Sequence, residues 1–163
     1  MNEFYGQRVP TIETAKALLK EAENLSPGPW VQHSLWVAKA AKLIAQNYED
    51  LHSDMAYILG LLHDIGRRNV LTNGRTTIGH MLGGYSYCKK LNYDLLAKIC
   101  ITHTCPSKSI NDIEEIVNKS CSYEDYKFVE DFFNKVEYDD YDKLIQLCDA
   151  LALPGVIENT FEL

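Results

Sequence analysis

The hexapeptide Leu-Leu-His-Asp-Ile-Gly, residues 61–66, places a histidine and an aspartate side by side at the end of an apolar run. Residues 55–62 are apolar nearly all round, which predicts a helix buried at the centre of the domain. A buried carboxylate is costly unless a positive group lies beside it. His63 and Asp64 could therefore bind a divalent metal together, or they could simply end the helix through hydrogen bonds. Taken alone, the dipeptide favours the second interpretation.

The composition fits one soluble globular domain, and we expect it to span residues 1–163 with a core of its own. The formal net charge is −7. This charge argues against a nucleic-acid polymer as the partner, because phosphate binding requires a basic face. It leaves a small phosphorylated substrate open if metal ions supply local positive charge.

The cysteines and the hydropathy indicate a cytoplasmic protein. No basic-then-apolar segment opens the sequence, so we expect no signal peptide. No apolar run approaches the roughly 20 residues that span a bilayer, so we expect no membrane partner. The five cysteines form no Cys-x-x-Cys pair, which favours reduced thiols over disulfides or a zinc knuckle. They are Cys88, Cys100, Cys105, Cys121 and Cys148.

Helical periodicity recurs along most of the chain, whereas no segment alternates over the length of a strand. Residues 1–10 are expected to be irregular. The pattern predicts a compact all-α bundle of about six to eight helices. Thr11 is expected to cap the first helix. The expected helices lie at 12–25, 30–48, 53–64, 77–91, 93–104, 123–135 and 140–153, with a short one inside 107–122.

Three further side chains that can bind metals fall on apolar helix faces. His33 lies near the start of one helix, and His103 lies at the end of another, just before Pro106. A single histidine in such a place is more often a hydrogen-bonded core residue than a ligand. Asp149 lies inside the apolar pattern of the last helix, and an aspartate is almost never buried without a partner. Asp149 therefore calls for a cation or for strong hydrogen-bond donors.

His80 belongs to a glycine-rich helix that begins near Thr77. Each glycine inside a helix costs roughly 1 kcal/mol relative to alanine, and close approach to a neighbouring backbone is a reason to tolerate it. Gly84 lies one turn after His80, so this face could press against the helix that carries the His-Asp pair. Taken alone, His80 would be a helix-start histidine without a special role.

Other charged residues have simple explanations. Arg67 and Arg68 could be a solvated pair at a helix end, or one of them could clamp a substrate phosphate. His52 lies in a polar connection, and we expect it to be solvated. The acidic run Asp139, Asp140 and Asp142 is expected to cap the last helix as solvated charges.

The strongest signal is the combination of these residues. Several histidines and two aspartates recur on apolar faces or near helix ends. Imidazole and carboxylate ligands suit iron, manganese, zinc or nickel, and they exclude an all-thiolate site. The set comprises His33, His63, Asp64, His80, His103 and Asp149.

This pattern resembles the HD-domain superfamily of metal-dependent phosphohydrolases, whose motif is H…HD…D. The segments Val31–Ala38, Leu61–Gly66 and Leu147–Ala150 each resemble the local form of that family. The resemblance implies that one metal is held by His33, His63, Asp64 and Asp149. It also implies that His80 and His103 match the additional histidines of dinuclear members, in which the motif aspartate, here Asp64, bridges two metals.

The resemblance implies an enzyme that uses one or two divalent ions, with Fe, Mn, Ni, Zn and Mg all open. Its expected substrate is a nucleotide or a dinucleoside polyphosphate, attacked by metal-activated water, with Asp64 and with Arg67 or Arg68 as catalytic groups. Symmetrical diadenosine tetraphosphate hydrolases and cyclic-dinucleotide phosphodiesterases have such extended sites, but the Gly-Tyr-Pro signature of the latter is missing here. The alternatives are a di-iron oxygenase on the same fold and a non-catalytic nucleotide-binding helical module.

The pocket walls are expected to come from residues 69–77 and 105–122. The sequence departs from many relatives in one respect, because it stops soon after the last motif, where they carry a further helix.

Overall fold

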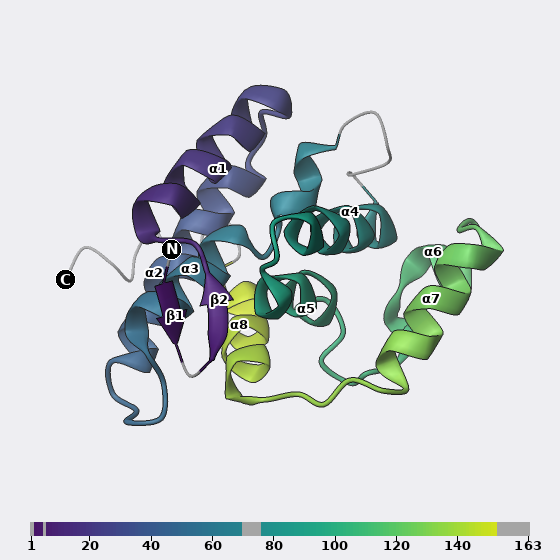
Figure 1. Cartoon of the computed structure of the whole chain (residues 1–163). Coiled ribbons are helices and arrows are strands. Elements are labelled where there is room, and N and C mark those ends of the chain that lie inside the picture. Colours follow the sequence, from purple (N-terminus) through teal and green to yellow (C-terminus); the bar gives the residue numbers. More distant parts are fainter. Residues whose placement is uncertain (1, 5, 70–75, 153–163) are drawn as a thin grey trace.

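The structure, a computed structural model, describes residues 2–4, 6–69 and 76–152. Within these ranges the chain forms an all-α bundle, as the sequence predicts (Figure 1). The helices are α1 (Ile12–Leu25), α2 (Trp30–Ala45), α3 (Ser53–Leu62), α4 (Thr77–Lys90), α5 (Asp94–Thr102), α6 (Glu114–Val117), α7 (Tyr123–Phe133) and α8 (Asp140–Leu151), with 3₁₀ turns η1 (Ile65–Arg68) and η3 (Ile110–Asp112).

The expectation of an irregular lead-in is wrong. Strands β1 (Asn2–Phe4) and β2 (Gln7–Val9) form a short antiparallel hairpin, with Asn2 opposite Val9. Gly6 lies in the turn with φ of 75°, a left-handed conformation that glycine adopts at little cost. Three-residue strands are too short for an alternating pattern to reveal them.

Side-chain caps fix where several helices begin. Thr11 caps α1, as predicted, and Thr76 caps α4 in the same way. At the start of α8, Asp139 and Asp142 form a capping box, in which each carboxylate accepts a backbone N–H from the other residue. These caps matter for function because α4 and α8 both carry candidate metal ligands in a terminal turn.

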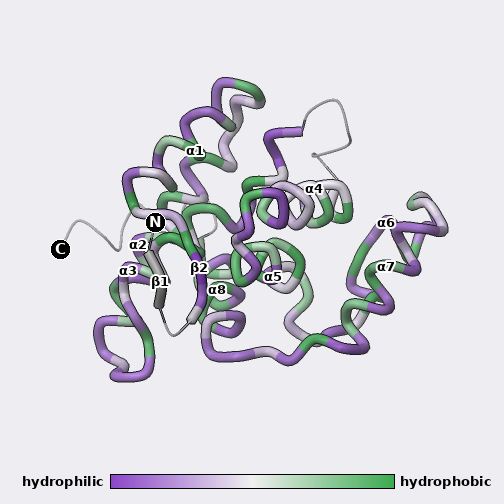
Figure 2. Tube along the Cα trace, viewed as in Figure 1, coloured by the Kyte–Doolittle hydropathy of each residue, from purple (hydrophilic) through white to green (hydrophobic). Residues whose placement is uncertain are grey.

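The core has two parts. The larger part joins α1, α2, α3, α5 and α8, and the helix α3 that leads to the His-Asp pair is buried at its centre. In Figure 2 the apolar colouring follows α5 through the middle of the molecule. A smaller cluster lies where α4 and α5 meet the segment around α6 and α7; its buried members are Ile78, Met81, Ile101, Cys105, Ile113, Val129 and Phe133.

The backbone of η1 rests directly on α4. A Cβ atom at Gly66 would lie 1.9 Å from the carbonyl oxygen of His80 and 2.4 Å from the nitrogen of Gly84. A Cβ atom at Gly84 would in turn lie 2.9 Å from the sulfur of Cys100. Gly84 does allow a close approach, but its nearest neighbours are Cys100 of α5 and the nitrogen of Gly66 in η1 (3.3 Å), and not α3 as expected. This contact places His80 beside the turn that follows Asp64.

Two remaining expectations concern membranes and thiols. Across the described ranges, none of the helices combines the length and the apolar character that crossing a bilayer requires. All five cysteines are free thiols.

Candidate metal centre

Six side chains that lie far apart in the sequence converge on one place in the fold. They form three overlapping groups in which the potential ligand atoms lie within 4.8 Å of one another. Every residue lies at the end of a helix or directly after one, so that helix ends from five elements meet here. The groups are His33–His63–Asp64, His63–His103–Asp149 and Asp64–His80–His103.

The four histidines of the cluster are oriented in the same way. Each places Nδ1 within hydrogen-bond distance of a backbone carbonyl, which can only accept, so Nδ1 carries the proton. The neutral ring then has a free lone pair on Nε2, and Nε2 is the atom that faces the carboxylates. The carbonyl partners are Ala152 for His33 (3.1 Å), Gly60 for His63 (2.7 Å), Thr76 for His80 (2.8 Å) and Ile99 for His103 (3.0 Å).

Asp149 of α8 defines one half of the centre. Its Oδ1 atom lies 2.7 Å from Nε2 of His33 and 3.4 Å from Nε2 of His63. The side chains of His33 and Asp149 are 20% and 26% exposed, whereas His63 is fully buried. This half therefore borders solvent, with His63 buried beneath it.

Asp64 defines the other, buried half. Its Oδ1 atom lies 3.3 Å from Nε2 of His80 and 3.5 Å from Nε2 of His103. The two Nε2 atoms are themselves 3.3 Å apart. Asp64 also lies 3.9 Å from Nε2 of His63, so its carboxylate stands between the two halves.

The charge states follow from burial and from these neighbours. Burial would raise the pKa of Asp64, but His63, His103 and His80 outweigh it and hold that pKa well below its usual value. Burial lowers the pKa of His80 to about 4, so His80 is neutral near pH 7. For His63, burial acts to lower the pKa, yet Asp64 and Asp149 together raise it. In the metal-free chain, the two carboxylates therefore favour a proton on His63. A bound cation would balance the same negative charges.

The donor set fits a divalent metal. Nε2 of His63 and Oδ1 of Asp64 are buried and have no hydrogen-bond partner among the described residues, which is costly in a protein interior. Neighbouring ligands of an ion bound at about 2.1 Å are separated by roughly 3.0 to 3.4 Å, close to the spacing of the atoms here. Converging lone pairs at such distances repel one another unless a cation lies between them.

Arg67 and Arg68 contact different partners. Nε of Arg67 donates to Oδ2 of Asp64 at 2.6 Å, and its side chain is 31% exposed, so Arg67 lies at the edge of the centre. Arg68 turns away: it pairs with Glu21 of α1 at 2.6 Å and stacks on the ring of Tyr87 at 4.0 Å. Of the two predicted phosphate clamps, the structure brings only Arg67 to the cluster.

Two sequence interpretations need correction. His52 precedes α3 outside the cluster, as expected, but it is half-buried and not fully solvated. Asp142 is fully buried and bonded to α5, not a solvated charge. The sequence also did not reveal the carbonyl groups that orient the histidines, although those of Gly60, Thr76 and Ile99 lie three or four residues before their partner, a spacing that could have predicted them.

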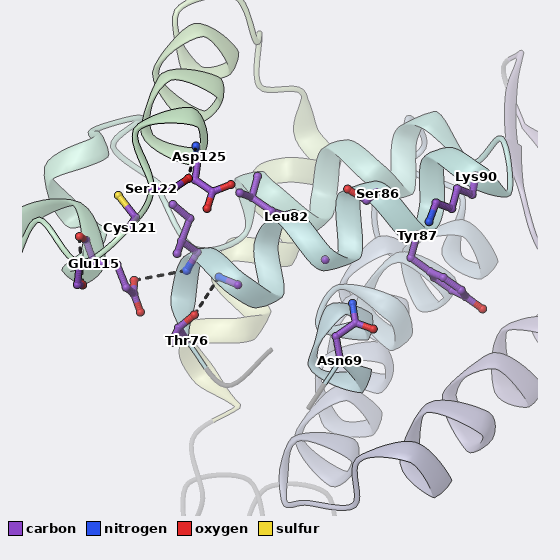
Figure 3. A pocket seen from close by; sticks show the side chains of 14 residues that line it. Asn69, Thr76, Leu82, Ser86, Tyr87, Lys90, Glu115, Cys121, Ser122 and Asp125 are labelled. Atoms are coloured by element: carbon purple, nitrogen blue, oxygen red, sulfur yellow. Dashed lines mark hydrogen bonds between the residues drawn. The ribbon is translucent and has the colours of Figure 1, made fainter. Parts of the chain in front are cut away.

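A cavity of about 700 Å³ lies elsewhere (Figure 3). It opens between α4 and the segment 115–125, and none of the six converging residues lines it. Asn69, Thr76 and Glu115 border it, so both predicted wall segments contribute to a cavity, but not to one that contains the metal-binding groups. Residues 70–75 of the first segment lie outside the described residues.

Comparison with known families identifies the class of this fold and site. Residues 30–153 match the family model of the HD domain, and the chain therefore belongs to the HD-domain family. The matched range contains all six converging residues. No curated protein and no solved structure matches the chain. The family implies membership of a superfamily of metal-dependent hydrolases, and the cluster supplies residues compatible with metal binding.

Proposed function

We propose that this protein is a phosphohydrolase that acts on a small phosphorylated molecule of the nucleotide or dinucleoside polyphosphate class. The observation that carries the proposal is the complete set of four histidines and two aspartates, with every Nε2 atom directed at a carboxylate. The free thiols of the chain support a reduced, cytoplasmic setting.

The residues divide into two sets that would hold up to two ions. His33, His63, Asp64 and Asp149 would hold one, and His80 and His103 would hold a second that shares Asp64. Divalent ions bound there supply a water of lowered pKa and positive charge for the phosphoryl oxygens.

The chain's own groups would orient the substrate. Arg67 donates a hydrogen bond from Nε to Asp64, and the remaining N–H groups of its guanidinium can donate to a phosphate oxygen. Because Arg67 is partly exposed, an incoming phosphate can reach it without a rearrangement of the core. The backbone carbonyl bonds keep the four imidazoles in one tautomer, so no reorientation is needed when the substrate binds.

A non-catalytic nucleotide-binding module is a weaker explanation. A site that had lost its chemistry would not need four imidazoles fixed in a ligand tautomer around two carboxylates. A di-iron oxygenase would use the same ligands, and oxygen consumption by the iron-loaded protein separates it from a hydrolase.

The test is turnover of a panel of nucleotides and dinucleoside polyphosphates with Mn²⁺, Fe²⁺, Co²⁺ or Ni²⁺ added to the purified protein. We expect metal-dependent hydrolysis of at least one member of the panel, with loss of the activity in Asp64→Ala. A metal-loaded protein that hydrolyses no phosphate ester or anhydride would overturn the proposal.

A further inference from the structure

The metal centre depends on the relative position of two helices that are distant in sequence. His103 directly follows α5, and Asp149 lies in the last turn of α8, yet both belong to one group with His63. A shift of α8 along α5 would move Asp149 away from the histidines. Something must therefore fix how these two helices sit against each other.

A buried carboxylate provides the first connection. Asp142 is fully buried, and its Oδ1 atom accepts a hydrogen bond from Oγ1 of Thr102 at 2.6 Å. Its Oδ2 atom accepts from Nζ of Lys98 at 2.6 Å and from the backbone N–H of Asp139 at 2.8 Å. Thr102 and Lys98 both belong to α5, so Asp142 binds α8 to that helix at two points.

A second connection uses the same residue of α5. Nε2 of Gln146, one turn further along α8, donates to the carbonyl oxygen of Thr102 at 2.8 Å in a buried environment. Thr102 thus offers its hydroxyl to one α8 side chain and its carbonyl to another. It is also the residue immediately before His103, so these bonds act on the backbone that carries the ligand.

The spacing on α8 extends the connection to the metal centre. Asp142, Gln146 and Asp149 lie at positions i, i+4 and i+7, which fall along one face of a helix. The first two contact Thr102, and the third contacts His33 and His63. One face of α8 therefore sets its register against α5 and presents the ligand about 10 Å further along, given a rise of about 1.5 Å per residue.

We propose that Thr102, Asp142 and Gln146 are positioning residues that set the spacing of His103 and Asp149, and that they thereby control the affinity of the centre for divalent metal. The inference rests on the metal centre of the proposed function but not on its substrate. The alternative is that the three residues only stabilise the fold.

The test is the affinity of the full chain for Mn²⁺, measured by isothermal titration calorimetry on wild type and Thr102→Val. Valine keeps the size of the side chain and removes the hydroxyl donor. We expect affinity to fall about tenfold or more, as it does when groups that orient metal ligands are lost. Thr102→Ser retains the donor, and we expect its affinity to lie within about twofold of wild type.

Val129→Ala is the matched control, because it opens a cavity in the smaller core cluster and leaves the hydrogen bonds of Thr102 with Asp142 and Gln146 in place. Its melting temperature should fall while its Mn²⁺ affinity stays at the wild-type value. If Thr102→Val does not fold, Gln146→Met removes the other bond and is expected to weaken Mn²⁺ binding in the same way.

Equal Mn²⁺ affinity in wild type and Thr102→Val would overturn the inference, as would an equal loss in Val129→Ala at the same change in melting temperature. A wild type that binds Mn²⁺ but hydrolyses no substrate would overturn only the proposed function. The two failures are therefore separate observations.

Discussion

The metal centre and the segment around α6 and α7 both gather polar side chains beside a buried cluster, but they are organised differently. In the centre, His63, Asp64, His80 and His103 are all buried, and each ring is bonded to a backbone carbonyl. Around α6 and α7, the polar lining of the large cavity includes exposed groups such as Ser120 and Ser122.

The two regions therefore differ in how rigidly their polar groups are held, and not only in volume or polarity. The cavity of about 700 Å³ has room for a ligand, yet Glu115, one of the acidic residues of its wall, accepts the backbone N–H groups of Thr77 and Ile78 at the start of α4. In the centre, Nε2 of His63 and Oδ1 of Asp64 are buried and have no hydrogen-bond partner among the described residues. We therefore expect substitutions in the centre to affect chemistry and similar ones near the cavity to affect little.

The largest difference should come from removing one carboxylate in each region. Asp64→Ala is expected to lower phosphohydrolase activity by about 10³-fold or more, because the carboxylate shared by both halves of the centre is lost. Asp125→Ala, at the cavity, should retain activity within about twofold. Steady-state rates with added Mn²⁺ provide the comparison, and equal losses in both variants would remove the distinction between the regions.

Two glycines with different surroundings, Gly66 beside the centre and Gly83 at the cavity, extend the comparison to stability. Gly66→Ala would place Cβ 1.9 Å from a backbone oxygen of α4, and we expect a loss of at least about 3 kcal/mol or failure to fold. Gly83→Ala would bring Cβ within 2.9 Å of Nδ2 of Asn69, a side-chain end that can move, and no closer than 3.4 Å to the backbone of Gly66. Its effect should stay below about 1 kcal/mol in urea unfolding. A harmless Gly66→Ala would contradict the close packing of η1 on α4.

The buried histidines should also give the metal-free protein a specific pH dependence. The pKa of His80 falls from 6.5 to about 4 on folding, so between these values the unfolded chain binds a proton that the folded chain does not. Stability should therefore decrease as pH falls through this window, by roughly 3 kcal/mol in total. Urea unfolding in EDTA measures this slope.

His80→Gln provides the control for that slope, because glutamine does not titrate. His63 acts in the opposite sense: its raised pKa stabilises the fold below about pH 6.5, and this contribution disappears as pH rises through the folded-state pKa. The decrease in the free energy of unfolding at low pH that disappears in His80→Gln is therefore the contribution of His80. An unchanged slope in His80→Gln would contradict the assignment.

The smallest expected contrast separates the two arginines. Arg67→Gln should lower kcat/KM by about 10- to 100-fold, because a charged donor to Asp64 and to phosphate is lost. Arg68→Gln should leave kcat/KM within about twofold and cost about 1 kcal/mol of stability, through the lost contacts with Glu21 and Tyr87. Equal effects on kcat/KM would show that proximity to Asp64 does not decide which arginine acts.

Much of the fold and of the site could be predicted from the sequence. Helical periodicity gave the long helices within a few residues, because each buries one apolar face. Five of the six converging residues were predictable because they lie on or beside apolar helix faces, where histidines and aspartates are rare. His80 joined the set only through the resemblance to the HD-domain superfamily. The position of these residues at helix ends also agrees with the structure.

The remaining features depend on contacts between distant segments. Asp142 looks like a solvated cap because it stands in an acidic run, and only the approach of α5 buries it. Arg67 and Arg68 are adjacent and chemically identical, so only the 3₁₀ turn η1 decides which of them faces Asp64. The hairpin at residues 2–9 is too short to leave a periodic signal.

The most direct test of the account is the metal content of the purified chain after reconstitution with Mn²⁺ and gel filtration, measured by mass spectrometry for wild type and Asp64→Ala. We expect wild type to retain one or two ions per chain and Asp64→Ala to lose most of them. A wild type that retains no more Mn²⁺ than Asp64→Ala would contradict the claim that these six side chains form a metal centre.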